Sequence, residues 1–216
     1  MSDIEKGHNG AGGRLLAATH PTGVANPASL GLFSFASTTF ILSFYNTNVD
    51  GITAPNVVVG MALFCGGLAQ FLAGMWEFPR GNTFGATAFT SYGAFWLSFA
   101  TIFWPSSGII AAYKTDKELN DALGIYLFSW FIVTVFFLIG SIRKSVAFIA
   151  LFGFLSLTFL LLAVGKFVPE KPKITVAGGG VGIVTAFIAY YIGLSDLLAA
   201  ERAAVVGLPI GGFKHD

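Results

Sequence analysis

The side chains of this chain that could bind a solute are mostly uncharged, and they stand inside long apolar stretches. Gln70 is the clearest case, because an amide buried in hydrocarbon must face other helices or a wet cavity. Thr38 and Thr39 occur in an earlier apolar stretch. If the third apolar stretch is a helix, its hydroxyl side chains fall close to one face. These are Thr83, Thr87, Thr90 or Ser91, and Ser98. These hydroxyls bond either a passing solute or their own helix carbonyls, and the residue types leave both interpretations open.

Side chains of the kind that carry enzymatic catalysis are not grouped in this sequence. The histidines, His8, His20 and His215, all stand near the chain ends, and Cys65 is the single cysteine. We find no nucleophile motif, no phosphate-binding loop and no dinucleotide-binding fingerprint after a strand. We therefore expect no enzyme activity, no metal site and no cofactor.

The composition indicates an integral membrane protein. Of the 216 residues, 55% are hydrophobic and 11% are charged, whereas soluble domains carry about 25% charged residues. A net charge of +1 offers no footprint for nucleic acid. Runs of about 20 apolar residues are long enough to cross a bilayer. Six are expected, near Ala28–Tyr45, Pro55–Trp76, Thr83–Trp104, Ala122–Ile142, Val146–Val164 and Ile174–Leu198. They lack strand-like alternation, which predicts an all-α, six-transmembrane-helix bundle.

The expected organisation is one membrane domain between two tails. Residues 1–25 form a mobile polar tail without the apolar core of a secretory signal, residues 26–205 form the six-helix domain, and residues 206–216 form a short C-terminal tail. An even number of spans places both termini on one side. With both termini in the cytoplasm, the inner segments carry more lysine and arginine than the outer loops, which favours this orientation.

Three blocks of sequence, in order, carry a resemblance to a known family. Residues 26–32 read Asn-Pro-Ala-Ser-Leu-Gly-Leu. Residues 66–74 read Gly-Gly-Leu-Ala-Gln-Phe-Leu-Ala-Gly, and residues 81–93 read Gly-Asn-Thr-Phe-Gly-Ala-Thr-Ala-Phe-Thr-Ser-Tyr-Gly. Together they resemble the acetate transporter family, which includes the succinate–acetate permeases, and the detail is most similar to fungal members. Ser29 departs from the family signature, which usually has a second proline there.

The resemblance implies a pore within each six-helix protomer, assembly as a homohexamer and a place in the plasma membrane. It implies transport of acetate and related small monocarboxylates, with succinate as a further substrate to consider. Channel-like and proton-coupled descriptions both exist for such proteins, so the coupling stays open. Matched through the motifs, the pore constriction would consist of Phe35, Tyr92 and Leu155.

The residues and the resemblance together predict a polar path without fixed charge. We expect an acetate anion to meet Asn26 and Asn82 at helix starts, where free backbone N–H groups favour anions. Further contacts would come from Thr38, Thr39, Gln70 and Thr87. A fixed lysine or arginine would hold a carboxylate too tightly for fast release. Glu77 and Asp196 are expected near span ends, in reach of water.

Two other functions fit the same sequence. The chain could be a membrane protein that senses acetate without transporting it, or a pore for another small solute such as ammonium or urea. Uptake measured in vesicles, with competition by other solutes, separates these alternatives.

Overall fold

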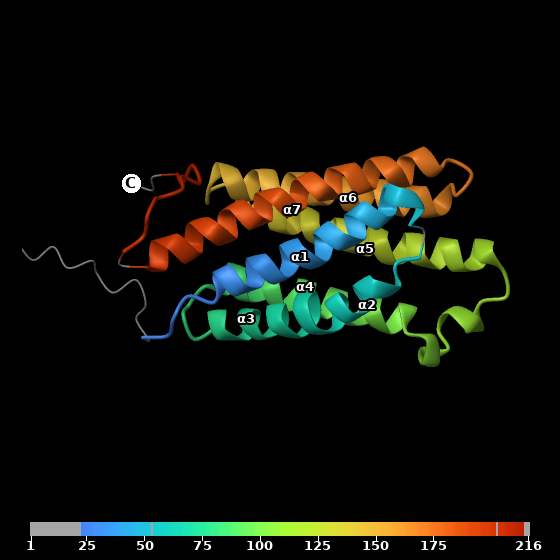
Figure 1. The fold of residues 1–216 in the computed structure, drawn as a ribbon, viewed down its shortest axis with the longest axis horizontal. Helices are drawn as coiled ribbons and strands as arrows, with labels where there is room; N and C mark the ends of the chain where they lie inside the picture. Colours follow the sequence, from blue (N-terminus) through green and yellow to red (C-terminus); the bar gives the residue numbers. More distant parts are fainter. Residues whose placement is uncertain (1–22, 53, 202, 214–216) are drawn as a thin grey trace, which may run out of the picture.

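Long helices make up most of residues 23–52, 54–201 and 203–213, which the computed structural model describes. Most of the predicted tail of residues 1–25 lies outside this part of the chain. The helices lie side by side along one axis (Figure 1). Their bounds are α1 Ala28–Asn46, α2 Asn56–Leu63, α3 Gln70–Glu77, α4 Thr83–Phe103, α5 Asp116–Ser141, α6 Val146–Phe167 and α7 Pro172–Ala200.

Among the described residues, five helical stretches are long and apolar enough to cross a membrane. They are Ala28–Asn46, Asn56–Glu77, Asp116–Ser141, Val146–Phe167 and Pro172–Ala200. Each corresponds to one predicted apolar run. The remaining run became α4, which is 21 residues long and packs against α3. It is less apolar because threonine, serine and glycine stand between its aromatic residues.

One predicted boundary was wrong. The fourth run was expected to start at Ala122, after a polar loop, but α5 starts at Asp116. The Thr115 hydroxyl accepts a hydrogen bond from the Glu118 backbone N–H and caps the helix. Acidic side chains in this first turn favour the positive end of the helix dipole, so the supposed loop residues are helical.

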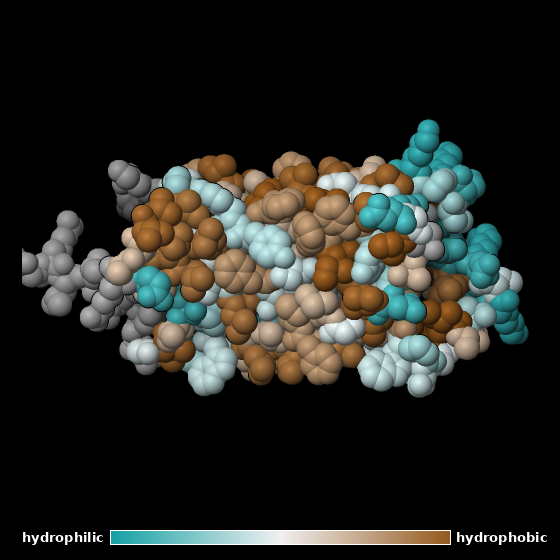
Figure 2. Space-filling model, viewed as in Figure 1, coloured by the Kyte–Doolittle hydropathy of each residue, from teal (hydrophilic) through white to brown (hydrophobic). Residues whose placement is uncertain are grey.

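The outer surface of the bundle is apolar over its middle. Figure 2 shows a hydrophobic zone across the centre of the molecule and hydrophilic side chains gathered at one end. Among the outward-facing side chains, Phe64 is 69% exposed and Ile125 and Phe136 are each 65% exposed. An apolar belt of this kind is unfavourable in water and suited to lipid. The chain is therefore a multi-pass membrane protein.

The second span contains an irregular turn that positions Gln70. Between α2 and α3, residues Phe64–Ala69 form a π-helical segment, a local feature often found at functional sites. A side chain at Gly66 would come within 2.7 Å of the Thr38 hydroxyl, so this position has room only for glycine. α3 begins directly after the segment, and Gln70 is 1% exposed.

Small residues bring the helix backbones close together. A Cβ at Gly93 of α4 would lie 2.7 Å from the Phe71 backbone nitrogen of α3. On α7, Gly178 faces α6 and Gly182 faces α1, which lets these helices pack closely. Gly81 lies in the turn before α4 with φ +77°, a conformation that favours glycine.

The end of the chain folds back onto the start of α6. The Val146 N–H donates to the Gly211 carbonyl over 2.9 Å, and the Ala147 N–H donates to the Ile210 carbonyl over 3.1 Å. These carbonyls satisfy backbone donors that a helix start otherwise leaves without partners. The C-terminal segment therefore lies at the same end of the bundle as the start of α1 (Figure 1).

We expect Gly93→Ala to lower the free energy of unfolding by about 1–3 kcal/mol, because the added methyl group pushes α3 and α4 apart. Thermal unfolding in detergent, followed by tryptophan fluorescence, measures the effect. Gly153→Ala in α6 is the matched control, since a Cβ there meets nothing within 4 Å. Equal unfolding temperatures for the two variants would contradict the close approach of these helices.

Candidate functional site

A cavity of about 250 Å³ opens at the end of the bundle where α1, α4 and α6 begin. We call it the near cavity. Its outer part is lined by residues of helix starts and turns, including Asn26, Arg80, Asn82 and Lys144. Its inner part is mostly apolar and ends at Phe35, Tyr92 and Leu155. A pocket that is apolar inside and polar at its mouth suits a small solute with one polar group.

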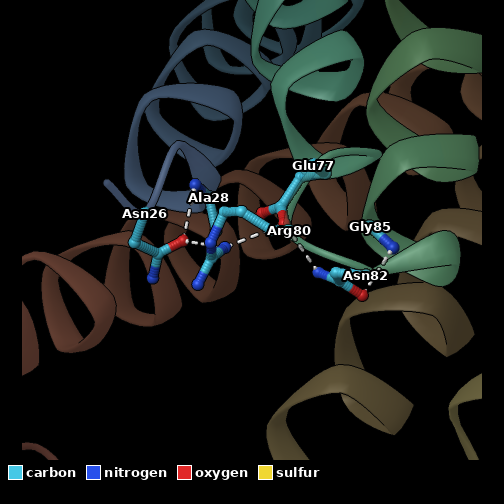
Figure 3. A network of polar contacts seen from close by, with 6 residues as sticks. All are labelled: Asn26, Ala28, Glu77, Arg80, Asn82 and Gly85. Carbon is cyan, nitrogen blue, oxygen red and sulfur yellow. Dashed lines mark hydrogen bonds and ion pairs between the residues drawn. The ribbon is translucent and has the colours of Figure 1, made fainter. Parts of the chain in front are cut away.

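A buried carboxylate organises the mouth of the near cavity (Figure 3). Glu77, the last residue of α3, is 0% exposed. Its Oε2 accepts hydrogen bonds from the Arg80 guanidinium over 2.8 Å and from the Asn82 amide over 3.1 Å. The same arginine donates to Asn26 Oδ1 over 2.7 Å. The network joins the segment before α1, the end of α3 and the start of α4.

Each asparagine also accepts a hydrogen bond from a backbone N–H in the first turn of the helix that follows it. Asn26 Oδ1 accepts from the Ala28 N–H over 3.0 Å, and Asn82 Oδ1 accepts from the Gly85 N–H over 3.1 Å. The prediction that these helix starts carry free N–H groups was therefore wrong for the two capped donors. Both side chains still lie at the mouth of the near cavity.

The expectation of a polar lining without fixed charge does not hold for the near cavity. Arg80, Lys144 and Asp196 all line the near cavity, and Glu77 is fully buried rather than in reach of water. Residues 77–82 had been assigned to a loop, so the i,i+3 spacing of Glu77 and Arg80 was not recognised as an ion pair. The i,i+3 spacing of these two residues was the feature of the sequence that could have predicted the ion pair. The Lys144 ammonium lies 4.5 Å from the centre of the Phe84 ring, which holds it beside the mouth.

The structure brings the three expected constriction residues together from α1, α4 and α6. Phe35 is 5% exposed, and Tyr92 and Leu155 are each 3% exposed. The rings of Phe35 and Tyr92 have their centres 5.6 Å apart. The Tyr92 hydroxyl lies 2.9 Å from the Thr134 hydroxyl of α5. The three side chains thus form the floor of the near cavity, while their role as a gate stays a prediction.

The other predicted contact residues divide into two groups. Gln70 lines the near cavity, and its Oε1 has no hydrogen-bond partner among the described residues. Thr38, Thr39 and Thr87 do not line it. Thr38 donates to the Ser34 carbonyl, and the exposed Thr87 donates to the Thr83 carbonyl over 2.8 Å. These two hydroxyls therefore bond their own helix, which was the alternative interpretation.

Nothing in the described part of the chain gathers three or more histidine, cysteine, aspartate or glutamate side chains that could hold a metal ion. The residues that line the near cavity can supply electrostatic attraction, hydrogen bonds and an apolar surface. Interactions of these kinds are the ones that pores use to select small solutes.

Comparison with known proteins agrees with this geometry. The chain matches the model of the GPR1/FUN34/yaaH family over residues 10–210. It is 46% identical to ammonia transport outward protein 2 of Saccharomyces cerevisiae, over 89% of this chain and 68% of that protein. It is 42% identical to acetate permease A of Emericella nidulans, over 88% of this chain and 66% of that protein.

A solved structure has the same fold. The bacterial acetate channel SatP superimposes with a TM-score of 0.76 and 33% sequence identity, covering 87% of this chain and 99% of that one. Five fungal relatives are longer than this chain, which spans between 60% and 68% of their length. The family model covers nearly the whole chain, and the chain belongs to the GPR1/FUN34/yaaH family.

Proposed function

We propose that this protein is a pore for acetate and related small monocarboxylates, with α4 as the sixth membrane span. The proposal places it in the plasma membrane as a homohexamer with cytoplasmic termini. One observation supports it most: the near cavity runs from a charged mouth to a floor made of the three side chains that the family resemblance implies as a constriction. The names of acetate permease A and of the acetate channel SatP support the choice of solute.

In this proposal the mouth attracts the anion. Arg80 and Lys144 supply positive charge, and the Asn82 and Gln70 amides supply hydrogen bonds along the wall. A cleft lined by positive charge raises the local concentration of anions. Asp196 on the same wall limits that attraction.

Glu77 answers the difficulty that a fixed arginine would hold a carboxylate too tightly. Its carboxylate contacts Arg80 at 2.8 Å, and their side chains are 0% and 11% exposed. An arriving acetate must share the guanidinium with a carboxylate that is already bound. Binding is thereby weakened, and weak binding allows fast release.

The constriction would let acetate pass when water briefly enters it. Phe35 and Leu155 present apolar surfaces, and a narrow apolar constriction opposes passage of a hydrated ion. The Tyr92 hydroxyl can offer a hydrogen bond to a carboxylate only by sharing or leaving Thr134. A hydrogen bond from Tyr92 to the carboxylate would partly replace the hydrogen bonds to water that acetate loses in the constriction.

Purified protein in liposomes tests the proposal, with labelled acetate outside and propionate, succinate and ammonium as competitors. Uptake that acetate and propionate inhibit supports it. Acetate binding without uptake would favour the sensing alternative. An imposed pH gradient addresses coupling, since accumulation above equilibrium indicates proton coupling and simple equilibration indicates a channel.

Ammonium transport is the second candidate, because one relative is named ammonia transport outward protein 2. Asp196 at the mouth and the buried Glu77 could attract a cation. Uptake of labelled methylammonium in the same liposomes, unaffected by acetate, would favour this candidate over the first.

We expect Leu155→Trp to reduce the initial rate of acetate uptake by about tenfold or more, because an indole ring would fill the floor of the near cavity. Phe154→Trp is the matched control, since Phe154 precedes Leu155 on α6 and is 40% exposed. Wild-type uptake by a folded Leu155→Trp variant would show that the floor is not the gate.

We expect Glu77→Gln to lower the free energy of unfolding by about 3–5 kcal/mol, because it removes the carboxylate of a buried ion pair. Acetate should then raise the unfolding temperature of this variant more than that of the wild type, since its carboxylate can replace the lost one at Arg80. The exposed pair of Lys117 and Asp121 provides the control. Asp121→Asn should change the free energy of unfolding little. If acetate raised the unfolding temperature equally in the wild type, Glu77→Gln and Asp121→Asn, the proposed role of Glu77 would be contradicted.

A further inference from the structure

A second cavity, of about 450 Å³, lies at the opposite end of the bundle. We call it the far cavity. It is formed where α1, α4 and α6 end and α5 begins, and its lining includes Asn46, Phe99, Asn120, Leu127, Leu162 and Lys166. A solute that crosses the floor of the near cavity would have to reach this space before leaving the protein.

The floor of the near cavity does not adjoin the far cavity directly. On α4, Tyr92 lines the near cavity and Phe99 lines the far one. On α6, Leu155 and Leu162 hold the corresponding positions. At 1.5 Å per residue, each helix therefore advances by roughly 10 Å between the two cavities. This distance is longer than one side-chain layer, so a second layer must fill it.

Aromatic rings fill this interval. Phe95 on α4 and Phe159 on α6 line neither cavity, and they are 4% and 5% exposed. Their ring centres are 5.3 Å apart with the planes at 88°, so the edge of one ring closes against the face of the other. The pair spans the bundle between the same two helices that carry Tyr92 and Leu155.

α5 supplies the rest of the layer. The Trp130 ring lies 5.1 Å from Phe95 and 5.9 Å from Tyr92, so it contacts both the layer and the floor of the near cavity. The Tyr126 ring stacks on Phe95 at 5.7 Å and 16°. The Tyr126 hydroxyl donates to the Phe95 carbonyl over 3.1 Å, which fixes the stack against α4.

The position of these rings distinguishes a barrier from ordinary core packing. Rings that only fill the core would lie beside the line that joins the two cavities. Along α4, Phe95 instead lies between Tyr92 of the near cavity and Phe99 of the far cavity. Along α6, Phe159 lies between Leu155 of the near cavity and Leu162 of the far cavity. A closed aromatic layer at that place excludes water from the path.

We propose that Phe95 and Phe159, held by Trp130 and Tyr126, form a second hydrophobic barrier in series with Phe35, Tyr92 and Leu155. The proposal rests on the proposed function as a pore for small carboxylates. It follows that an anion sheds water at two layers, and that opening one layer leaves the other as the main resistance.

Initial rates of acetate uptake into liposomes, per reconstituted protein, test the series arrangement. The variants are Leu155→Ala, Phe159→Ala and their double variant, with the outward-facing Phe154→Ala as the control. For two resistances in series, removing one of two equal layers raises the rate by at most about twofold, whereas removing both raises it by more than about fourfold. We expect the double variant to exceed the product of the two single effects, and Phe154→Ala to match the wild type.

A double variant whose rate equals or falls below that product would overturn the second barrier, because the substitutions would then act on one layer. If Phe159→Ala does not purify as a folded protein, Phe159→Leu takes its place in the same comparison. Wild-type protein that carries no acetate would overturn the proposed function itself. Acetate uptake by the wild type without the excess in the double variant would overturn only the second barrier.

Discussion

The contact between the buried Glu77 carboxylate and the Arg80 guanidinium determines how one end of the bundle is built. A carboxylate that is 0% exposed needs charged or polar partners, and Arg80 and Asn82 supply them. Through these partners the carboxylate joins the start of α1, the end of α3 and the start of α4 (Figure 3). This arrangement shapes the mouth of the near cavity, because Arg80 and Asn82, two of its polar lining residues, come from the turn that follows Glu77.

In the proposed pore, the same contact would reconcile attraction of the anion with its fast release. Arg80 would draw an anion toward the mouth, and Glu77, which contacts Arg80 at 2.8 Å, would weaken the complex that forms there. Beyond the mouth the proposed path is apolar, first at the buried Phe35 and Leu155 and then at the buried Phe95 and Phe159. The charged turn would therefore set the capture of solute, and the apolar layers would set its passage.

The sequence predicted what depends on local composition and on motifs. The apolar runs became helices because a bilayer requires every backbone group to be paired within the segment. Asn26, Gln70 and Asn82 all line the near cavity, as do Phe35, Tyr92 and Leu155, while the roles expected of them stay predictions. The charges at the mouth were missed, because burial of Glu77 depends on α1 and α4 lying over a turn that reads as an exposed loop. Thr87 does not line the near cavity, because hydroxyl spacing does not reveal which face a helix turns outward.

The central claim is that the near cavity is the route of the carboxylate, and a cysteine at Ala88 tests it most directly. Ala88 lines the near cavity and is 5% exposed. In a Cys65→Ser background, Ala88→Cys would be treated in liposomes with a charged, membrane-impermeant thiol reagent applied to both sides. The account predicts that modification stops acetate uptake and that acetate slows the modification. Complete modification with unchanged uptake would contradict it.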